Sequence, residues 1–201
     1  MRDVAAIILA GGMSRRMGAQ NKLLLPIAGC PMIRHVVRQY KAAFDGPIVV
    51  VAGHDAPDVE RALADCDVQC VFNPDYETGQ QTSVAVGLRH APDASSLLIG
   101  LGDQPVLQAA DIRALLDAHA AAGRGKISIP VSDETRGNPI VVPHGLRAGL
   151  TADPARAGCM RFTRENPALV QRHTLRAEGF YKDIDTPDDY IDLTHEEGLT
   201  L

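Results

Sequence analysis

A basic stretch near the start of the chain has the residue types that bind phosphate groups. It reads LAGGMSRRMGAQNK over residues 9–22, with adjacent glycines, Gly11 and Gly12, followed by two arginines and Lys22. Glycines permit a turn with positive φ that brings bare backbone N–H groups close to a ligand. No acidic residue interrupts the stretch. It therefore predicts an anion-binding loop; a solvated surface loop with a glycine turn is the alternative.

Two common phosphate-binding motifs do not fit this spacing. A P-loop ends in Gly-Lys-Ser/Thr, whereas Lys22 stands between Asn21 and Leu23. A dinucleotide fingerprint reads G-x-G-x-x-G, whereas five residues separate the doublet here from the next glycine.

Two aspartates are candidate ligands for Mg²⁺, which proteins hold by one or two carboxylates together with substrate phosphates. Asp103 ends the apolar run in LLIGLGDQP. Asp185 lies in DIDTPDDY, directly before a helix start in which Thr186 is the N-cap and a proline follows. For each aspartate, a turn or capping role is the alternative.

Two further segments carry candidate ligand contacts. YETGQQTSVAVGL places Gly79 before a polar first helical turn that contains Ser83, which would contact a base or ribose, or simply cap the helix. RGNPIVVP places Arg136 and Asn138 at the entry of a strand, as substrate contacts or as a strand-entry turn. The motifs G-x-S-x-G and H-E-x-x-H are absent from the sequence. Phosphoryl-type transfer needs alignment and charge neutralisation more than a protein nucleophile, and it fits this set.

The elements that must position these residues alternate between strands and helices. This alternation predicts an α/β protein with a Rossmann-like fold, in which a mostly parallel central sheet has helices on both faces and ligands bind at the carboxyl ends of the strands. We expect one domain, 1–201, with a less regular region, 132–183, as an antiparallel addition or a lid on the substrate side. The predicted strands are Val4–Leu9, Pro47–Ala52, Val68–Phe72, Ser96–Leu101, Lys126–Pro130 and Pro139–Val142, and the predicted helices are Met32–Ala43, Ala56–Asp65, Gln81–His90 and Ala109–Ala121.

Composition narrows the function classes. A formal net charge of −5 and 4% aromatic residues argue against a nucleic-acid binder. No apolar run approaches the roughly 20 residues of a membrane span. The four cysteines lack the grouping of a zinc site, so we expect reduced thiols in a cytoplasmic protein.

Taken together, LAGGMSRRMGAQNK, GDQP and DIDTPDDY resemble the nucleotidyltransferases of molybdenum-cofactor maturation, which have a Rossmann-like fold. NKLLLPIAGCPMIRHV and GQQTSVAVGL are most like the cytidylyl branch, whereas Gly12 is more typical of the guanylyl branch. The resemblance implies Mg²⁺-dependent transfer of CMP from CTP to the terminal phosphate of molybdopterin, with pyrophosphate as the second product. A molybdoenzyme would be the downstream partner.

The resemblance also implies residue roles. Lys22, Arg16 and Asp103 would be catalytic, Asp103 and Asp185 would hold the metal, and Arg136 and Asn138 would bind the acceptor. The nucleotide would contact Leu9, Ala10, Gly11, Gly12, Arg16, Lys22, Gly79 and Ser83. The alternatives are GTP as donor, a sugar or polyol phosphate as acceptor, and a non-catalytic nucleotide-binding chaperone that delivers the cofactor.

Overall fold

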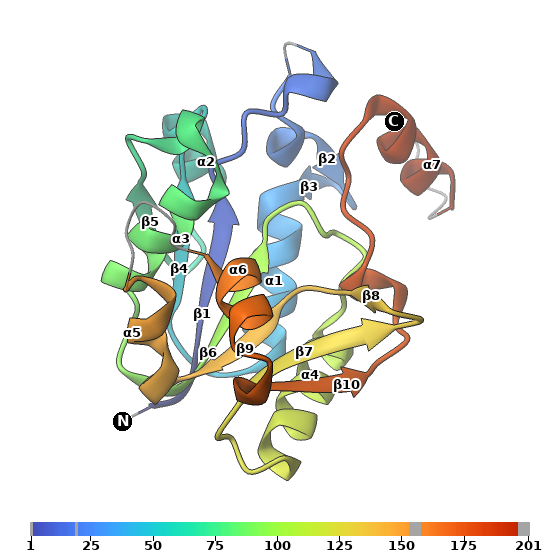
Figure 1. Cartoon of the computed structure of the whole chain (residues 1–201). Helices are drawn as coiled ribbons and strands as arrows, with labels where there is room; N and C mark the ends of the chain where they lie inside the picture. The colour runs from blue at the N-terminus through green and yellow to red at the C-terminus, as the bar shows by residue number, and fades with distance from the viewer. Residues whose placement is uncertain (1, 19, 153–157, 197–201) are drawn as a thin grey trace.

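An eight-stranded sheet runs through the molecule, with helices on both faces (Figure 1). The structure, a computed structural model, describes residues 2–18, 20–152 and 158–196. The strand order is β10-β7-β9-β6-β1-β4-β5, and β8 pairs with β7 outside this row. The strands of the sheet are β1 (Arg2–Ala10), β4 (Ile48–Ala52), β5 (Gln69–Phe72), β6 (Ala94–Leu101), β7 (Ile127–Ser132), β8 (Thr135–Arg136), β9 (Ile140–Pro143) and β10 (Val170–Thr174).

Most neighbouring strands are parallel, as the alternation of elements predicts. The central strand β1 pairs in parallel with β4 on one side and β6 on the other. The exceptions are β9, which lies antiparallel between β6 and β7, and the short β8, which pairs antiparallel with β7. A separate short hairpin joins β2 (Pro26–Ile27) to β3 (Cys30–Pro31).

Each face of the sheet buries its own hydrophobic core. Along β1, Ala6 and Ile8 face one core, while Ala5 and Ile7 face the other, because successive strand residues point to opposite faces. The first core is closed by α1, α2 and α4, and the second by α3 and α5. The helices are α1 (Met32–Ala43), α2 (Ala56–Ala62), α3 (Gln80–Arg89), α4 (Ala109–Ala121), α5 (Arg147–Leu150), α6 (Cys159–Glu165) and α7 (Pro187–Glu196).

A glycine inside α3 lets this helix lie directly on the sheet. A Cβ atom on Gly87 would lie 2.7 Å from Cγ2 of Ile7 in β1. This close approach offsets the cost, about 1 kcal/mol, of a glycine inside a helix. It also fixes the height of the polar N-terminal turn of α3 above the end of β1.

The predicted elements agree with the structure to different degrees. The helices Met32–Ala43 and Ala109–Ala121 agree end to end, whereas α2 stops at Ala62, three residues before its predicted end. α3 is shifted one residue towards the N-terminus. The sequence analysis missed β10, because its residues VQRHT are mostly polar and half or fully exposed.

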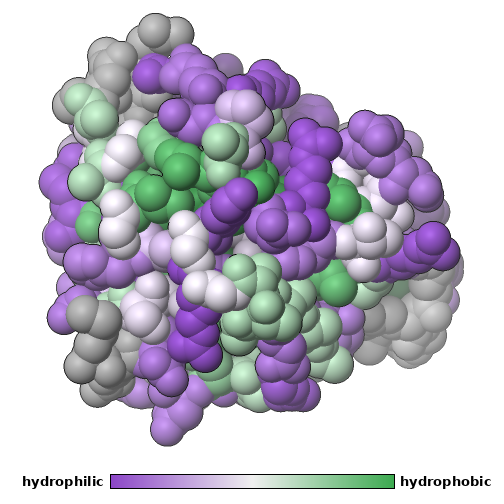
Figure 2. Space-filling model, turned by 60° about the horizontal axis from the view of Figure 1, so that its bottom comes forward, coloured by the Kyte–Doolittle hydropathy of each residue, from purple (hydrophilic) through white to green (hydrophobic). Residues whose placement is uncertain are grey.

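The region 132–183 contributes β8, the antiparallel strand β9, α5, α6 and β10, while residues 153–157 within it lie outside the described residues. Among the described residues, no helix combines the length and the apolar character needed to cross a membrane. On the face that Figure 2 shows, hydrophobic residues form patches bordered by hydrophilic ones.

Candidate nucleotide and metal site

A cavity of about 480 Å³ opens where β1 and β6 end, within the usual range for small-molecule sites. Its position agrees with the rule that ligands bind outside the carboxyl ends of parallel strands. Every residue predicted to bind nucleotide or metal lines it: Leu9, Ala10, Gly11, Gly12, Arg16, Lys22, Gly79, Ser83, Asp103 and Asp185.

The glycine doublet lines this cavity but does not form the predicted turn with positive φ. Neither Gly11 nor Gly12 has a positive φ. In this loop the residues with positive φ are Ser14 at 49°, in the left-handed conformation, and Gly18 at 72°. The turn with positive φ therefore comes later than predicted. Gly11 is needed for close approach, because a Cβ there would lie 2.9 Å from the Ser83 hydroxyl oxygen. A Cβ on Gly12 would meet nothing within 4 Å.

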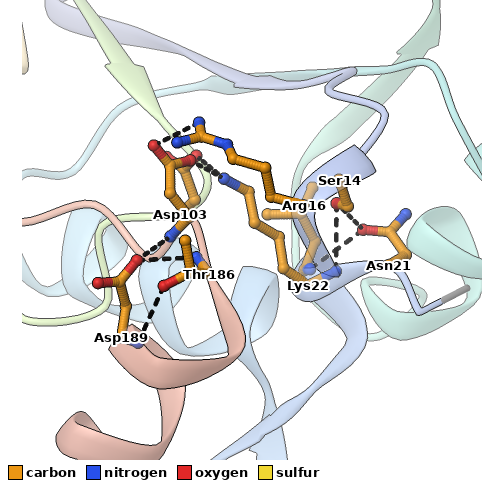
Figure 3. Close-up of polar contacts among 9 residues, drawn as sticks. Ser14, Arg16, Asn21, Lys22, Asp103, Thr186 and Asp189 are labelled. Atoms are coloured by element: carbon orange, nitrogen blue, oxygen red, sulfur yellow. Dashed lines mark hydrogen bonds and ion pairs between the residues drawn. The ribbon is translucent and has the colours of Figure 1, made fainter. Parts of the chain in front are cut away.

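Lys22 is held in place by local hydrogen bonds. It begins a short 3₁₀ turn whose N-cap is Asn21, and the Asn21 side-chain oxygen accepts a bond of 3.1 Å from the backbone N–H of Leu23. The backbone N–H of Lys22 donates to the Ser14 hydroxyl at 3.3 Å. The residue is buried, with 8% of its surface exposed, so its aliphatic stem is packed and its ammonium group points into the cavity (Figure 3).

The Lys22 ammonium bridges two carboxylates. Its Nζ atom lies 2.6 Å from Oδ2 of Asp103 and 2.8 Å from Oδ1 of Asp185. The guanidinium of Arg16 reaches the other oxygen of Asp185 at 2.7 Å. Two cations from the glycine loop thus meet two anions, one from the loop after β6 and one from the segment before α7 (Figure 3).

These contacts fix the charges of the groups. Burial alone would lower the pKa of Lys22, but the Asp103 and Asp185 carboxylates outweigh it and raise that pKa, so the ammonium stays protonated. Partial burial would raise the pKa of Asp185, but Lys22 and Arg16 lower it overall. Burial and the nearby Asp103 charge raise the pKa of Asp183.

A capping box positions Asp185. The Thr186 hydroxyl accepts from the backbone N–H of Asp189 at 3.2 Å, and the Asp189 carboxylate accepts from the N–H groups of Thr186 and Asp185 at 2.7 and 3.0 Å. The backbone N–H of Ile184 donates to the carbonyl oxygen of Asp103 at 2.9 Å. The segment before α7 is therefore attached to the segment after β6. The cap uses the side chains of Thr186 and Asp189, so the Asp185 side chain can line the cavity.

Three carboxylates suit a divalent cation. Asp103, Asp183 and Asp185 each offer an oxygen atom, and the three lie within 4.8 Å of one another. The buried Oδ1 of Asp103 has no hydrogen-bond partner among the described residues, which leaves a ligand atom unused. The residues therefore fit a metal such as Mg²⁺. The sequence analysis missed Asp183, although its place two residues before Asp185 was a usable signal.

The start of α3 forms the wall opposite the carboxylates. Asn73, fully buried after β5, donates hydrogen bonds of 2.9 Å to the hydroxyls of both Thr82 and Ser83. This pair of bonds orients the Ser83 hydroxyl against Gly11. Gly79 has a φ of 127°, a conformation that favours glycine and turns the chain into α3.

Arg136 and Asn138 lie outside this cavity. They line an adjoining one of about 350 Å³, beside Cys159 and Met160 of α6. The two cavities share Leu9, Gln80 and Leu101, so they meet at the ends of β1 and β6. The site therefore has two compartments, one basic and carboxylate-lined, the other holding the two predicted acceptor contacts.

A mostly parallel α/β sheet with basic groups and clustered carboxylates at its carboxyl edge has the side chains suited to a phosphorylated ligand together with a metal. The chain belongs to the family of the MobA-like NTP transferase domain, whose model matches residues 6–173. The matched residues therefore form an NTP transferase domain.

Among curated relatives, the bifunctional protein GlmU of Paraburkholderia phymatum is 27% identical over 206 residues. That alignment covers 97% of this chain and 45% of GlmU, so the chain spans less than half the length of this relative.

Solved structures share the fold. A nucleotidyl transferase from Methanothermobacter thermautotroptrophicus superposes with a TM-score of 0.80 at 22% identity, covering 98% of both chains. Rv0371C from Mycobacterium tuberculosis, in complex with manganese, gives 0.73 at 22% identity and covers 96% of this chain and 98% of that one. CMP:2-keto-3-deoxy-manno-octonic acid synthetase, in complex with CTP, gives 0.72 at 16% identity and covers 100% and 99%.

Proposed function

We propose that this protein transfers CMP from CTP to the terminal phosphate of molybdopterin in a Mg²⁺-dependent reaction, releasing pyrophosphate. The observation that carries the proposal is the arrangement of two joined cavities. The first contains Lys22, Arg16 and three carboxylates, and the second contains Arg136 and Asn138. A donor nucleotide in the first and an anionic acceptor in the second would meet at Leu9 and Leu101.

The choice of nucleotide and acceptor is supported by the sequence. The segments NKLLLPIAGCPMIRHV and GQQTSVAVGL resemble the cytidylyl branch of the molybdenum-cofactor nucleotidyltransferases. A protein with the same fold has been solved with CTP bound. Gly12, the residue that resembles the guanylyl branch, faces open space, which leaves room for either a glycine or an alanine at this position.

In the proposed reaction, an oxygen of the acceptor phosphate attacks the α-phosphorus of CTP in line. A P–O bond forms to the acceptor, and the bond to the β-phosphate oxygen breaks, so that the electron pair leaves with pyrophosphate. The attacking phosphate is already an anion near neutral pH, so no general base is required. Lys22 and Arg16, now paired with carboxylates, would neutralise the charge that develops on the phosphates.

Asp103 and Asp185, together with Asp183, would hold the metal. When bound, Mg²⁺ supplies charge neutralisation and alignment of the triphosphate. A neighbour of the same fold is solved with manganese, which supports a divalent cation at such a site. Arg136, half-buried and fixed by a 2.6 Å bond to the Thr163 hydroxyl, would orient the acceptor.

The deciding experiment measures pyrophosphate release with each of the four nucleoside triphosphates, with and without molybdopterin. Release with CTP that depends on molybdopterin is expected. Release with GTP in its place would assign the guanylyl activity. Release with CTP and a sugar or polyol phosphate, but not with molybdopterin, would contradict the proposed acceptor.

The variant Asp103→Ala tests the metal assignment. Because Asp103 offers a metal ligand, this variant should retain the fold and lose turnover by at least about 100-fold. An Asp103→Ala protein that stays substantially active would overturn the metal assignment. CTP binding without pyrophosphate release from the unaltered protein would instead indicate a carrier of bound nucleotide.

A further inference from the structure

A third cavity, of about 360 Å³, lies beyond Arg136 on the side away from the nucleotide. Three arginines line it: Arg136 from β8, Arg164 from α6 and Arg172 from β10. Among the described residues that line it, Glu134 is the one acidic residue. The lining thus carries three positive charges against one negative charge.

The register of the strands explains why the arginines converge. Arg172 pairs with Ile129 across β10 and β7, and Arg136 pairs with Val131 across β8 and β7. Ile129 and Val131 are two residues apart in β7, so they and their partners point to the same face of the sheet. Helix α6 lies over this face and adds Arg164.

The described residues give these three guanidinium groups no carboxylate partner. Neither Arg164 nor Arg172 forms an ion pair within the part of the chain that the structure describes. One N–H group of Arg136 donates a hydrogen bond to the Thr163 hydroxyl. Burial lowers the pKa of Arg136, and the charges of Arg164 and Arg172 lower it further. Repulsion of this kind is relieved when an anion lies between the cations.

The third cavity adjoins the proposed acceptor compartment. Arg136 and Met160 line both this cavity and the proposed acceptor compartment, so Arg136 forms the partition between them. An anion in the third cavity would contact the face of Arg136 opposite the acceptor phosphate. The fork of a guanidinium offers five donors, enough to serve both sides.

We propose that this three-arginine cavity is an oxyanion site for a phosphate-type group, separate from the triphosphate site. Arg164 and Arg172 donate paired hydrogen bonds to the oxyanion, and Arg136 completes the ring of donors. Two sources share this chemistry: an anionic group at the far end of the acceptor, and a free oxyanion. The proposed oxyanion site does not depend on which nucleotide is the donor. The pyrophosphate-release experiment can therefore contradict CTP as donor without contradicting this site.

The experiment is a calorimetric titration with inorganic phosphate in chloride buffer of matched ionic strength. Mg²⁺ and a saturating amount of whichever nucleoside triphosphate the protein binds most tightly keep phosphate out of the nucleotide cavity. The unaltered protein is compared with the double variant Arg164→Ala/Arg172→Ala and with Arg176→Ala. Arg176 is an exposed arginine just past β10 that does not line the cavity, so it controls for overall charge.

We expect phosphate to bind the unaltered protein and the Arg176→Ala control alike, with a Kd at least about tenfold higher in the double variant. The single variants Arg164→Gln and Arg172→Gln should each give part of this loss, which keeps the test decisive if the double variant does not fold. Equal phosphate affinity in all proteins, or an equal loss in the Arg176→Ala control, would overturn the proposal.

A second arm separates the two sources. If the acceptor extends into the cavity, the double variant raises the KM for the acceptor and leaves the KM for CTP unchanged. If the site takes a free oxyanion, phosphate affinity falls and the KM for the acceptor does not change.

Discussion

The Nζ atom of Lys22 lies 2.6 Å from Oδ2 of Asp103, so an ammonium group occupies the side of the carboxylate that faces the nucleotide cavity. The same ammonium lies 2.8 Å from Asp185. A metal held by these two carboxylates would therefore compete with Lys22 for their oxygen atoms. In the proposed function the triphosphate would resolve this competition, because its phosphates would give Lys22 another partner.

The first prediction concerns this competition. Replacing Lys22 by methionine removes the cation that offsets the carboxylates, so the nucleotide-free variant should bind Mn²⁺ about tenfold more tightly or better. Its pyrophosphate release should fall by at least about 100-fold, since the charge on the phosphates is no longer neutralised. Electron paramagnetic resonance of free Mn²⁺ measures the affinity.

The control for the lysine variant is Lys41→Met. Lys41 lies near the end of α1, and its ammonium pairs with the exposed Asp67. Its Mn²⁺ affinity should equal that of the unaltered protein. If Lys22→Met also leaves the Mn²⁺ affinity unchanged, the ammonium and the metal do not share their ligands.

The second prediction separates the two glycines of the doublet. An added methyl group on Gly11 would lie 2.9 Å from the Ser83 hydroxyl oxygen, whereas one on Gly12 would meet nothing within 4 Å. Gly11→Ala should therefore displace Ser83 and raise the Kd for CTP by about tenfold, the cost of a modest overpacking. Gly12→Ala should bind CTP almost normally. Calorimetric titration with CTP measures the Kd of both variants. Equal changes in Kd would contradict the steric argument.

The third prediction concerns the capping box at the start of α7. Thr186→Ala removes the hydroxyl that accepts from the backbone N–H of Asp189, and it should lower the free energy of unfolding by about 1 kcal/mol. Thr186→Ser keeps the hydroxyl and should retain most of the stability. Urea unfolding curves measure both. A loss in the serine variant as large as in the alanine variant would mean that the methyl group, rather than the cap, stabilises this turn.

The fourth prediction concerns pH. The buried His119 ring lies with Nδ1 2.9 Å from the Ser128 hydroxyl, which also contacts His173 at 2.9 Å. Burial, with smaller contributions from Arg124 and His173, lowers the pKa of His119 to about 4. Below pH 6.5 the unfolded chain binds this proton before the native protein does, so stability falls as the pH drops from 6.5 towards 4.

The pH effect is measured against His119→Gln, which cannot gain this proton. Between pH 7.5 and pH 5, the unaltered protein should lose about 2 kcal/mol more unfolding free energy than the variant. Groups common to both proteins cancel in this comparison. Parallel pH dependence in the two proteins would show that His119 titrates normally in the folded state.

The sequence carries enough information for the sheet and for the residues next to its strand ends. Asp103 follows an apolar strand, and Asp185 precedes a recognisable cap, so the local pattern alone singles out each as a candidate. Asp183 was missed because its role depends on the bond from Ile184 to Asp103, a contact between segments some 80 residues apart. The cluster of Arg136, Arg164 and Arg172 depends on strand register and on β10, whose polar residues resemble a loop.

The pairing of Arg16 with Asp185 has a consequence for the order in which the protein becomes functional during synthesis. These partners are 169 positions apart, so the loop that carries Arg16 is made long before the segment that carries Asp185. A chain still on the ribosome that ends before Asp183 contains every strand of the sheet and Asp103, but it lacks two of the three clustered carboxylates. The cluster of Asp103, Asp183 and Asp185 is thus complete only once the segment up to Asp185 has been made.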